Sequence, residues 1–141
     1  MLDTATGRVH LAHNEFSLHP LLSHRELEQL AKDQISFRYE TDNHYLHIYL
    51  WLEEAPGVYI HTGLCFHDER LVFIEFYPQY VAAAPEGNPS PMDDREAQVI
   101  VRAWYGVHFS RDQSTFPWGS VHCFLGSDPI YYPPRVRISY T

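Results

Sequence analysis

The fold is decided by the stretch ISFRYETDNHYLHIYLWLEEAPGVYIHTGLCFHDERLVFIEFY, which runs from Ile35 to Tyr77. Apolar and polar residues alternate along four runs of this stretch, and a period of two is typical of β-strands whose successive side chains point to opposite faces. The connections between the runs are short and rich in residues that favour turns. Because parallel neighbours need a crossover of a dozen or more residues, short connections predict antiparallel pairing. The stretch therefore predicts a four-stranded antiparallel meander.

Two helix starts flank this meander. Ser23, followed three residues later by Glu26, forms a capping box, which predicts a helix from His24 to about Lys32. The sequence Ser90-Pro91-Met92-Asp93 resembles a second helix start, with a capping Ser followed by Pro at the first helical position. It predicts a helix that ends near residue 107 and covers one side of the sheet with a broad apolar face.

The rest of the chain is expected to add strands and loops. Residues Arg8 to Ala12 and Glu15 to Leu18 predict a small hairpin, and Thr115 to Leu125 and Arg135 to Tyr140 predict two further strands. Pro78 to Pro91 holds four of the ten prolines and predicts a surface loop.

Length and composition fit one domain. The chain has 141 residues, of which 45% are hydrophobic and 15% are aromatic, so it can bury a substantial core. We expect residues 1–141 to form a single α+β domain, with an antiparallel meander sheet of about five to seven strands and two helices packed on it.

The charge distribution indicates what kind of partner the protein attracts. The net charge is −8, and residues 1–100 alone carry six basic and sixteen acidic groups, which leaves −10 on that part. An acidic surface repels phosphate backbones and attracts basic proteins, so we predict a protein partner and no nucleic acid. The alternative is that the acidic surface only keeps the protein soluble.

The sequence predicts no cofactor and no membrane association. The chain has two cysteines, too few for a disulfide framework, and its seven glycines form no phosphate-binding loop. Its beginning lacks a signal pattern, and no stretch is apolar enough to span a membrane. These features favour a cytoplasmic location.

No catalytic residue is predicted either. The nucleophile motif Gly-x-Ser-x-Gly is missing, and the adjacent His122 and Cys123 would point to opposite faces of a strand. Cys65 and Cys123 are expected to be small buried residues. If Leu50 faces Ile60 across the meander, His47 and His61 lie near each other and are the candidates for a metal site, but a third ligand would have to come from elsewhere.

Aromatic residues give the meander two different faces. One face is rich in Leu, Ile and Val, and the other is rich in Tyr, Trp and His. The second face is either covered by a helix or exposed as a binding surface, where Tyr and Trp would supply much of the binding energy. Together with neighbouring acidic turns it predicts a partner-binding surface made of Tyr49, Trp51, Glu53, Glu54, Tyr59, Asp68 and Glu69.

A resemblance supports this prediction. The segment Phe116-Pro117-Trp118-Gly119-Ser120-Val121, then Asp128, and the closing Arg137-Ile138-Ser139-Tyr140 resemble the ending of small bacterial proteins, some of which are immunity proteins of toxin systems. The resemblance covers about a quarter of the chain and implies no catalytic residue. It implies a non-enzymatic, acidic protein that blocks a partner toxin or enzyme, such as a basic toxin domain. The alternative is a small-molecule- or metal-binding protein with a His and aromatic pocket on the sheet.

Overall fold

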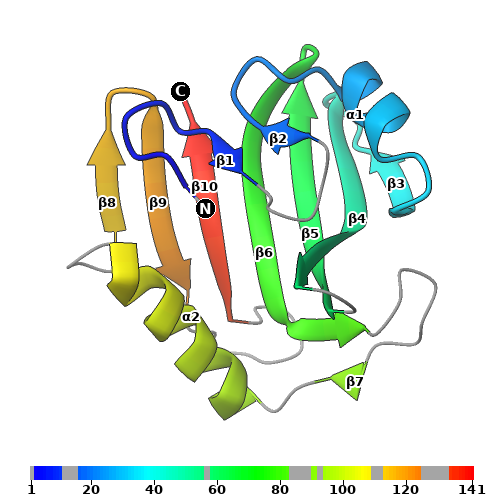
Figure 1. The fold of residues 1–141 in the computed structure, drawn as a ribbon. Coiled ribbons are helices and arrows are strands. Elements are labelled where there is room, and N and C mark those ends of the chain that lie inside the picture. Colours follow the sequence, from blue (N-terminus) through cyan, green and yellow to red (C-terminus); the bar gives the residue numbers. More distant parts are fainter. Residues whose placement is uncertain are drawn as a thin grey trace.

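The protein has an α+β fold, seen in a computed structural model that describes residues 2–10, 16–55, 58–82, 90–91, 94–108, 113–124 and 134–141 (Figure 1). The helices are α1 (His24–Leu30) and α2 (Asp94–His108). The strands are β1 (Val9–His10), β2 (Ser17–Leu18), β3 (Ile35–Glu40), β4 (Tyr45–Ala55), β5 (Val58–His67), β6 (Arg70–Ala82), β7 (Ser90–Pro91), β8 (Gln113–Phe116), β9 (Gly119–Phe124) and β10 (Arg135–Tyr140).

One large antiparallel sheet organises the molecule. Its strands follow the order β3-β4-β5-β6-β10-β9-β8, and the short β7 pairs with β6. The predicted meander is confirmed as β3 to β6, whereas β10 returns from the end of the chain to lie beside β6. The small hairpin is confirmed by the pairing of β1 with β2; the predicted strand residues 11, 12 and 15 lie outside the described residues.

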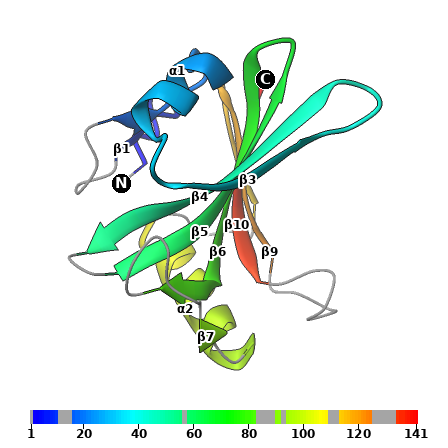
Figure 2. The same ribbon diagram turned by 90° about the vertical axis from the view of Figure 1, so that its right-hand side faces the viewer.

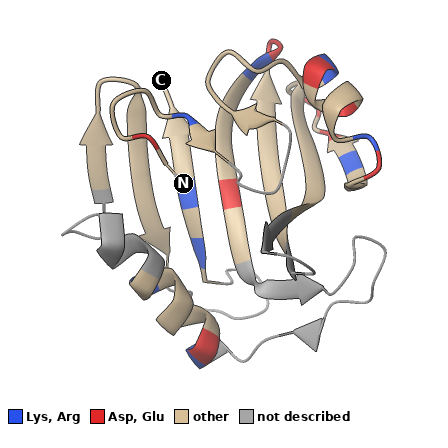
Figure 3. Cartoon of the chain, in the orientation of Figure 1, with Lys and Arg blue, Asp and Glu red and all other residues tan. Residues whose placement is uncertain are grey.

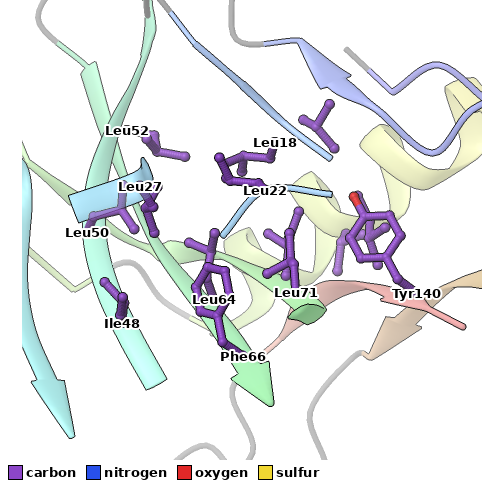
Figure 4. Close-up of a cluster of buried hydrophobic side chains, with 14 of the residues drawn as sticks. Leu18, Leu22, Leu27, Ile48, Leu50, Leu52, Leu64, Phe66, Leu71 and Tyr140 are labelled. Atoms are coloured by element: carbon purple, nitrogen blue, oxygen red, sulfur yellow. The ribbon is translucent and has the colours of Figure 1, made fainter. Parts of the chain in front are cut away.

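Both helices and the small hairpin lie on the same side of the sheet, as Figures 1 and 2 show. There they cover the aliphatic face, and Figure 4 shows the resulting core. Leu27 of α1 and Val101 of α2 are fully buried in this core. Ser23 caps α1 by accepting a hydrogen bond from the Glu26 amide at 3.2 Å, which confirms the capping box. Other core residues from the sheet and the hairpin are Leu18, Ile48, Leu50, Leu64, Phe66, Ile74, Val121, Val136 and Ile138.

The prediction of a loop from Pro78 to Pro91 is wrong at both ends. Strand β6 continues through Pro78 to Ala82, and Ser90 and Pro91 form β7. Proline is tolerated here because the pairing of β5 with β6 shifts between Tyr77 and Val81, so the missing Pro78 amide falls at an irregularity of the ladder. The predicted helix start at Ser90 is also wrong, because Ser90 and Pro91 form β7 and α2 begins only at Asp94. Residues 83–89, 92 and 93 lie outside the described residues.

The single strand predicted from Thr115 to Leu125 is in fact a hairpin. Strands β8 and β9 are joined by a turn at Pro117 and Trp118, where proline supplies no amide and Gly119 takes a φ of +152°. Trp118 also ties this turn to the start of the chain, because its indole donates a hydrogen bond to the Thr4 carbonyl at 2.8 Å. The Trp-Gly segment therefore has a structural role in this protein.

The register expected for β4 and β5 is also wrong. Leu50 pairs with Thr62 rather than with Ile60, a difference of two residues. A shift of two keeps every side chain on its predicted face, because side chains alternate with a period of two.

Within the described part of the chain, neither helix has the length and apolar character that crossing a bilayer requires.

Candidate functional site

The face of the sheet opposite the helices is the candidate site, and we call it the aromatic face. Figure 2 shows that neither described helix lies on this side of the sheet. Side chains from at least six strands reach it, as the cross-strand pairs show. They include Phe37, Tyr39, His47, Tyr49, Trp51, His61, Cys65, Phe73, Glu75, Tyr77, His122, Phe124, Arg135 and Arg137.

Stacking holds the rings of this face in place. The ring centroids of Phe37 and Tyr49 are 4.6 Å apart, and those of Tyr39 and His47 are 4.7 Å apart. Tyr49 lies over Gly63, where an added Cβ would come within 2.9 Å of the ring. Cross-strand aromatic pairs of this kind stabilise a sheet, and here they also fix the orientation of the outer rings.

A bulge in β3 brings two large rings to the solvent edge of this face. Strict alternation would put Ile35, Phe37 and Tyr39 on one face, but the pairing of β3 with β4 shifts between Ile35 and Phe37. Ile35 therefore packs against the core, whereas Phe37 and Tyr39 lie on the aromatic face and are 49% and 44% exposed. Half-exposed rings of this size are candidates for contact with a partner.

An ion-pair cluster lies at the centre of the aromatic face. Glu75 of β6 is only 6% exposed. Its Oε1 accepts hydrogen bonds from the Nε atoms of Arg135, at 2.8 Å, and Arg137, at 2.7 Å. The Tyr77 hydroxyl donates to the other carboxylate oxygen. Figure 3 shows the acidic position on β6 beside the basic positions on β10.

This cluster keeps Glu75 ionised. Burial on its own would raise the pKa of the carboxyl, but the hydrogen bond from Tyr77 and the two guanidinium groups outweigh it and lower the pKa. Burial, together with the negative charge of Glu75, raises the pKa of Tyr77, so this residue stays a hydrogen-bond donor. One carboxylate thus accepts hydrogen bonds from two guanidinium groups.

The two arginines also pack on aromatic rings. The guanidinium carbon of Arg135 lies 4.1 Å from the centre of the Phe124 ring, and that of Arg137 lies 4.4 Å from the centre of the Phe73 ring. Such contacts orient the planar guanidinium groups and shield them on one side from water. The Arg135 side chain is 11% exposed, and that of Arg137 is 33% exposed.

Burial changes the protonation of two histidines and one cysteine of this face. Burial lowers the pKa of both His47 and His61. Burial also raises the pKa of Cys65 to about 11, so its thiol is protonated near neutral pH. Cys65 and Cys123 are both buried, as expected, and Cys65 lies on the aromatic face with its sulfur 3.9 Å from Nε2 of His47.

The structure does not bring His47 and His61 to one metal ion. His47 pairs with Cys65 across β4 and β5, so His61 lies four residues further along β5. At about 3.3 Å per strand residue, this separates the two histidines by roughly 13 Å. Among the described residues there is no group of three or more His, Cys, Asp or Glu that could hold a metal ion.

A cavity beside α1 adds no group of metal-binding residues within the described part of the chain. Its volume is about 270 Å³, and it lies away from the aromatic face, between α1 and the turns that precede β4 and β6. Charged residues that line it form ion pairs with their neighbours, as Glu69 does with Arg25 at 3.3 Å. It is lined by His24, Arg38, Glu40, His44, Leu46, Phe66, Asp68 and Glu69.

The residues predicted to bind a partner are spread along the whole length of the β4–β5 hairpin. Tyr49 and Trp51 lie on the aromatic face, where Trp51 is only 7% exposed. Glu53, Glu54 and Tyr59 belong to the opposite end of the β4–β5 hairpin from Asp68 and Glu69, and their side chains lie outside the described part. Eight residue steps along β4, about 26 Å, separate Glu53 from Tyr45, the position that pairs with His67.

The central cluster of Glu75, Arg135 and Arg137 was not predicted from the sequence. A signal for it exists, because Glu75 is a single acidic residue within the apolar run of β6 and needs partners of opposite charge when buried. Arg135 and Arg137 alternate with apolar residues in β10 and so point to one face. The pairing of β6 with β10, which places Arg137 opposite Glu75, cannot be predicted from these local patterns.

Comparison with known proteins adds no further identification. No protein-family model matches the chain, and neither the curated proteins nor the solved structures contain a match.

Proposed function

We propose that the protein is a non-enzymatic binding protein that docks another protein on its aromatic face, in the manner of an immunity or inhibitor protein. The observation that carries the proposal is the pair of half-exposed rings, Phe37 and Tyr39, at the edge of a sheet face that no described helix covers. Buried aromatic residues on such faces contribute much of the binding energy of protein complexes.

The size and rigidity of the face favour a protein over a small molecule. The face crosses six neighbouring strands from β3 to β9, and five strand spacings of about 4.8 Å make it roughly 24 Å wide. Its rings are already stacked on one another, so little side-chain entropy is lost when a partner covers them. A broad surface with preoriented rings suits the area that protein complexes bury.

The charge of the protein favours a basic partner. The net charge of −8 attracts a positively charged protein over a longer range than the contacts themselves. Acidic groups such as Asp68, whose side chain is 82% exposed, lie at the ends of the hairpins rather than at the centre of the face. We therefore infer a partner, such as a toxin domain or an enzyme, whose surface is basic around the region that the aromatic face covers.

Substituting Tyr39 with Ala is expected to weaken the complex by about 2 kcal/mol, or roughly 30-fold in Kd, because a large aromatic contact would be lost. The partner would be captured with the tagged protein, purified, and titrated by calorimetry against the wild type and the variant. Leu30→Ala is the matched control, because Leu30 is 53% exposed but belongs to α1 on the covered side of the sheet. Equal losses in the two variants, or a loss only in the control, would contradict the proposal.

A further inference from the structure

Arg137 is the more exposed of the two arginines in the central ion-pair cluster. Its side chain is 33% exposed, compared with 11% for Arg135. Part of its guanidinium group is therefore open to a ligand on the aromatic face. When a partner excludes water from this face, an exposed positive charge needs a polar or negatively charged group of the partner in place of the lost solvent.

We propose that Arg137 is a carboxylate-binding subsite, and that the docked protein inserts an Asp or Glu side chain against it. This inference rests on the proposed function and adds to it the chemistry of one contact. A basic partner surface with a carboxylate at its centre would complement both the acidic protein and this one positive position.

The geometry distinguishes Arg137 from Arg135. Arg137 directs its Nε and one terminal nitrogen to Glu75 Oε1, at 2.7 and 2.6 Å. No described residue accepts a hydrogen bond from its second terminal nitrogen, and the side chain is 33% exposed, compared with 11% for Arg135. Arg137 therefore keeps N–H donors that a ligand can reach.

The surroundings of Arg137 favour a carboxylate over other anions. Phe73 packs 4.4 Å from the guanidinium carbon and Phe124 lies at 5.5 Å, so the group is held in a fixed plane between apolar neighbours. A planar carboxylate can pair with a fixed guanidinium edge through parallel hydrogen bonds.

Titration with phenylacetate, a carboxylate on an aromatic body, tests the subsite without the partner. The arginine Nε–H signals would be followed by NMR, with neutral phenylacetamide as the matched probe. We expect saturable shifts of the Arg137 signal with phenylacetate and at least tenfold weaker binding of phenylacetamide. Arg137→Gln should abolish phenylacetate binding, and Arg70→Gln, in an exposed residue at the start of β6, should leave it unchanged. No shift, or equal shifts with both probes, would overturn the subsite.

Affinity measurements with the purified partner then distinguish this inference from the proposed function. If Arg137→Gln raises the Kd at least tenfold and Arg70→Gln does not, the partner uses the subsite. If Tyr39→Ala weakens the complex but Arg137→Gln does not, the aromatic face docks the partner and the carboxylate contact is wrong. If phenylacetate binds in the micromolar range and no complex depends on Tyr39, the ligand is a small acid, and both the proposed function and the partner contact are overturned.

Discussion

Replacing Glu75 with Gln is expected to lower the free energy of unfolding by about 3 kcal/mol at pH 7, because it leaves two guanidinium groups without their shared counter-charge. Glu75 is 6% exposed and accepts hydrogen bonds from Arg135, Arg137 and Tyr77. The amide keeps the size of the side chain and removes its charge, so the loss reports on the charge rather than on packing. Urea unfolding of the wild type and the variant measures the difference.

The stability difference between the wild type and Glu75→Gln should depend on pH in a direction that the pKa of Glu75 determines. The pKa of Glu75 in the folded protein lies below its ordinary value of 4.5, so folding favours the ionised form. Its contribution to stability is therefore complete above about pH 5 and is lost as the pH falls through the folded-state pKa. The stability difference between wild type and Glu75→Gln should be constant from pH 7 to pH 5 and shrink on further acidification.

An exposed ion pair provides the control for Glu75. Glu69 lies 3.3 Å from Arg25, but both side chains are well exposed to water. Glu69→Gln should change the free energy of unfolding by less than about 1 kcal/mol, because solvent screens such pairs. Equal effects of the two substitutions, or a difference at Glu75 that does not shrink in acid, would show that the central cluster is not a buried ion pair.

Substituting Gly119 with Ala is expected to destabilise the protein by about 3 kcal/mol or more. The φ of this residue is +152°, and an added Cβ would lie 1.8 Å from the Ser139 carbonyl oxygen on β10. Gly119 pairs with Tyr140, so the backbone cannot move away without breaking the pairing of β9 with β10. Thermal unfolding followed by circular dichroism measures the loss.

The neighbouring residue gives the matched substitution for Gly119. Ser120 lies in the same strand, and its side chain points to the aromatic face, so Ser120→Ala should change stability by no more than about 0.5 kcal/mol. A Gly119→Ala protein as stable as Ser120→Ala would mean that the β8–β9 turn accommodates a side chain and that the close approach to Ser139 is wrong.

Local sequence patterns correctly predicted the elements whose partners lie nearby in the chain. The period of two predicted β3 to β6 because each hairpin pairs with the next, and the Ser23 capping box predicted the start of α1. The end of β6 was predicted too early because proline usually terminates a strand, whereas the irregular pairing at Pro78 tolerates it. Thr115 to Leu125 was read as one strand because the Pro117-Trp118 turn is too short to interrupt the apolar pattern.

The candidate site could be predicted only in part, for a different reason. The two faces of the meander follow from alternation alone, so Tyr49 and Trp51 were placed on the correct face. The bulge that exposes Phe37 and Tyr39 and the pairing of Glu75 with Arg137 depend on contacts that no local pattern records. The most highly charged part of the site is therefore built by residues about sixty positions apart in the chain.

Side-chain footprinting with hydroxyl radicals, on the free protein and on its complex with the purified partner, tests the central claim most directly. In the free protein, Phe37 and Tyr39 should react readily, because they are about half exposed. In the complex, we expect strong protection of these two rings and unchanged reactivity of Leu21 and Leu30, which are exposed on the helical side. Protection of Leu21 and Leu30 with no change at Phe37 and Tyr39 would contradict docking on the aromatic face.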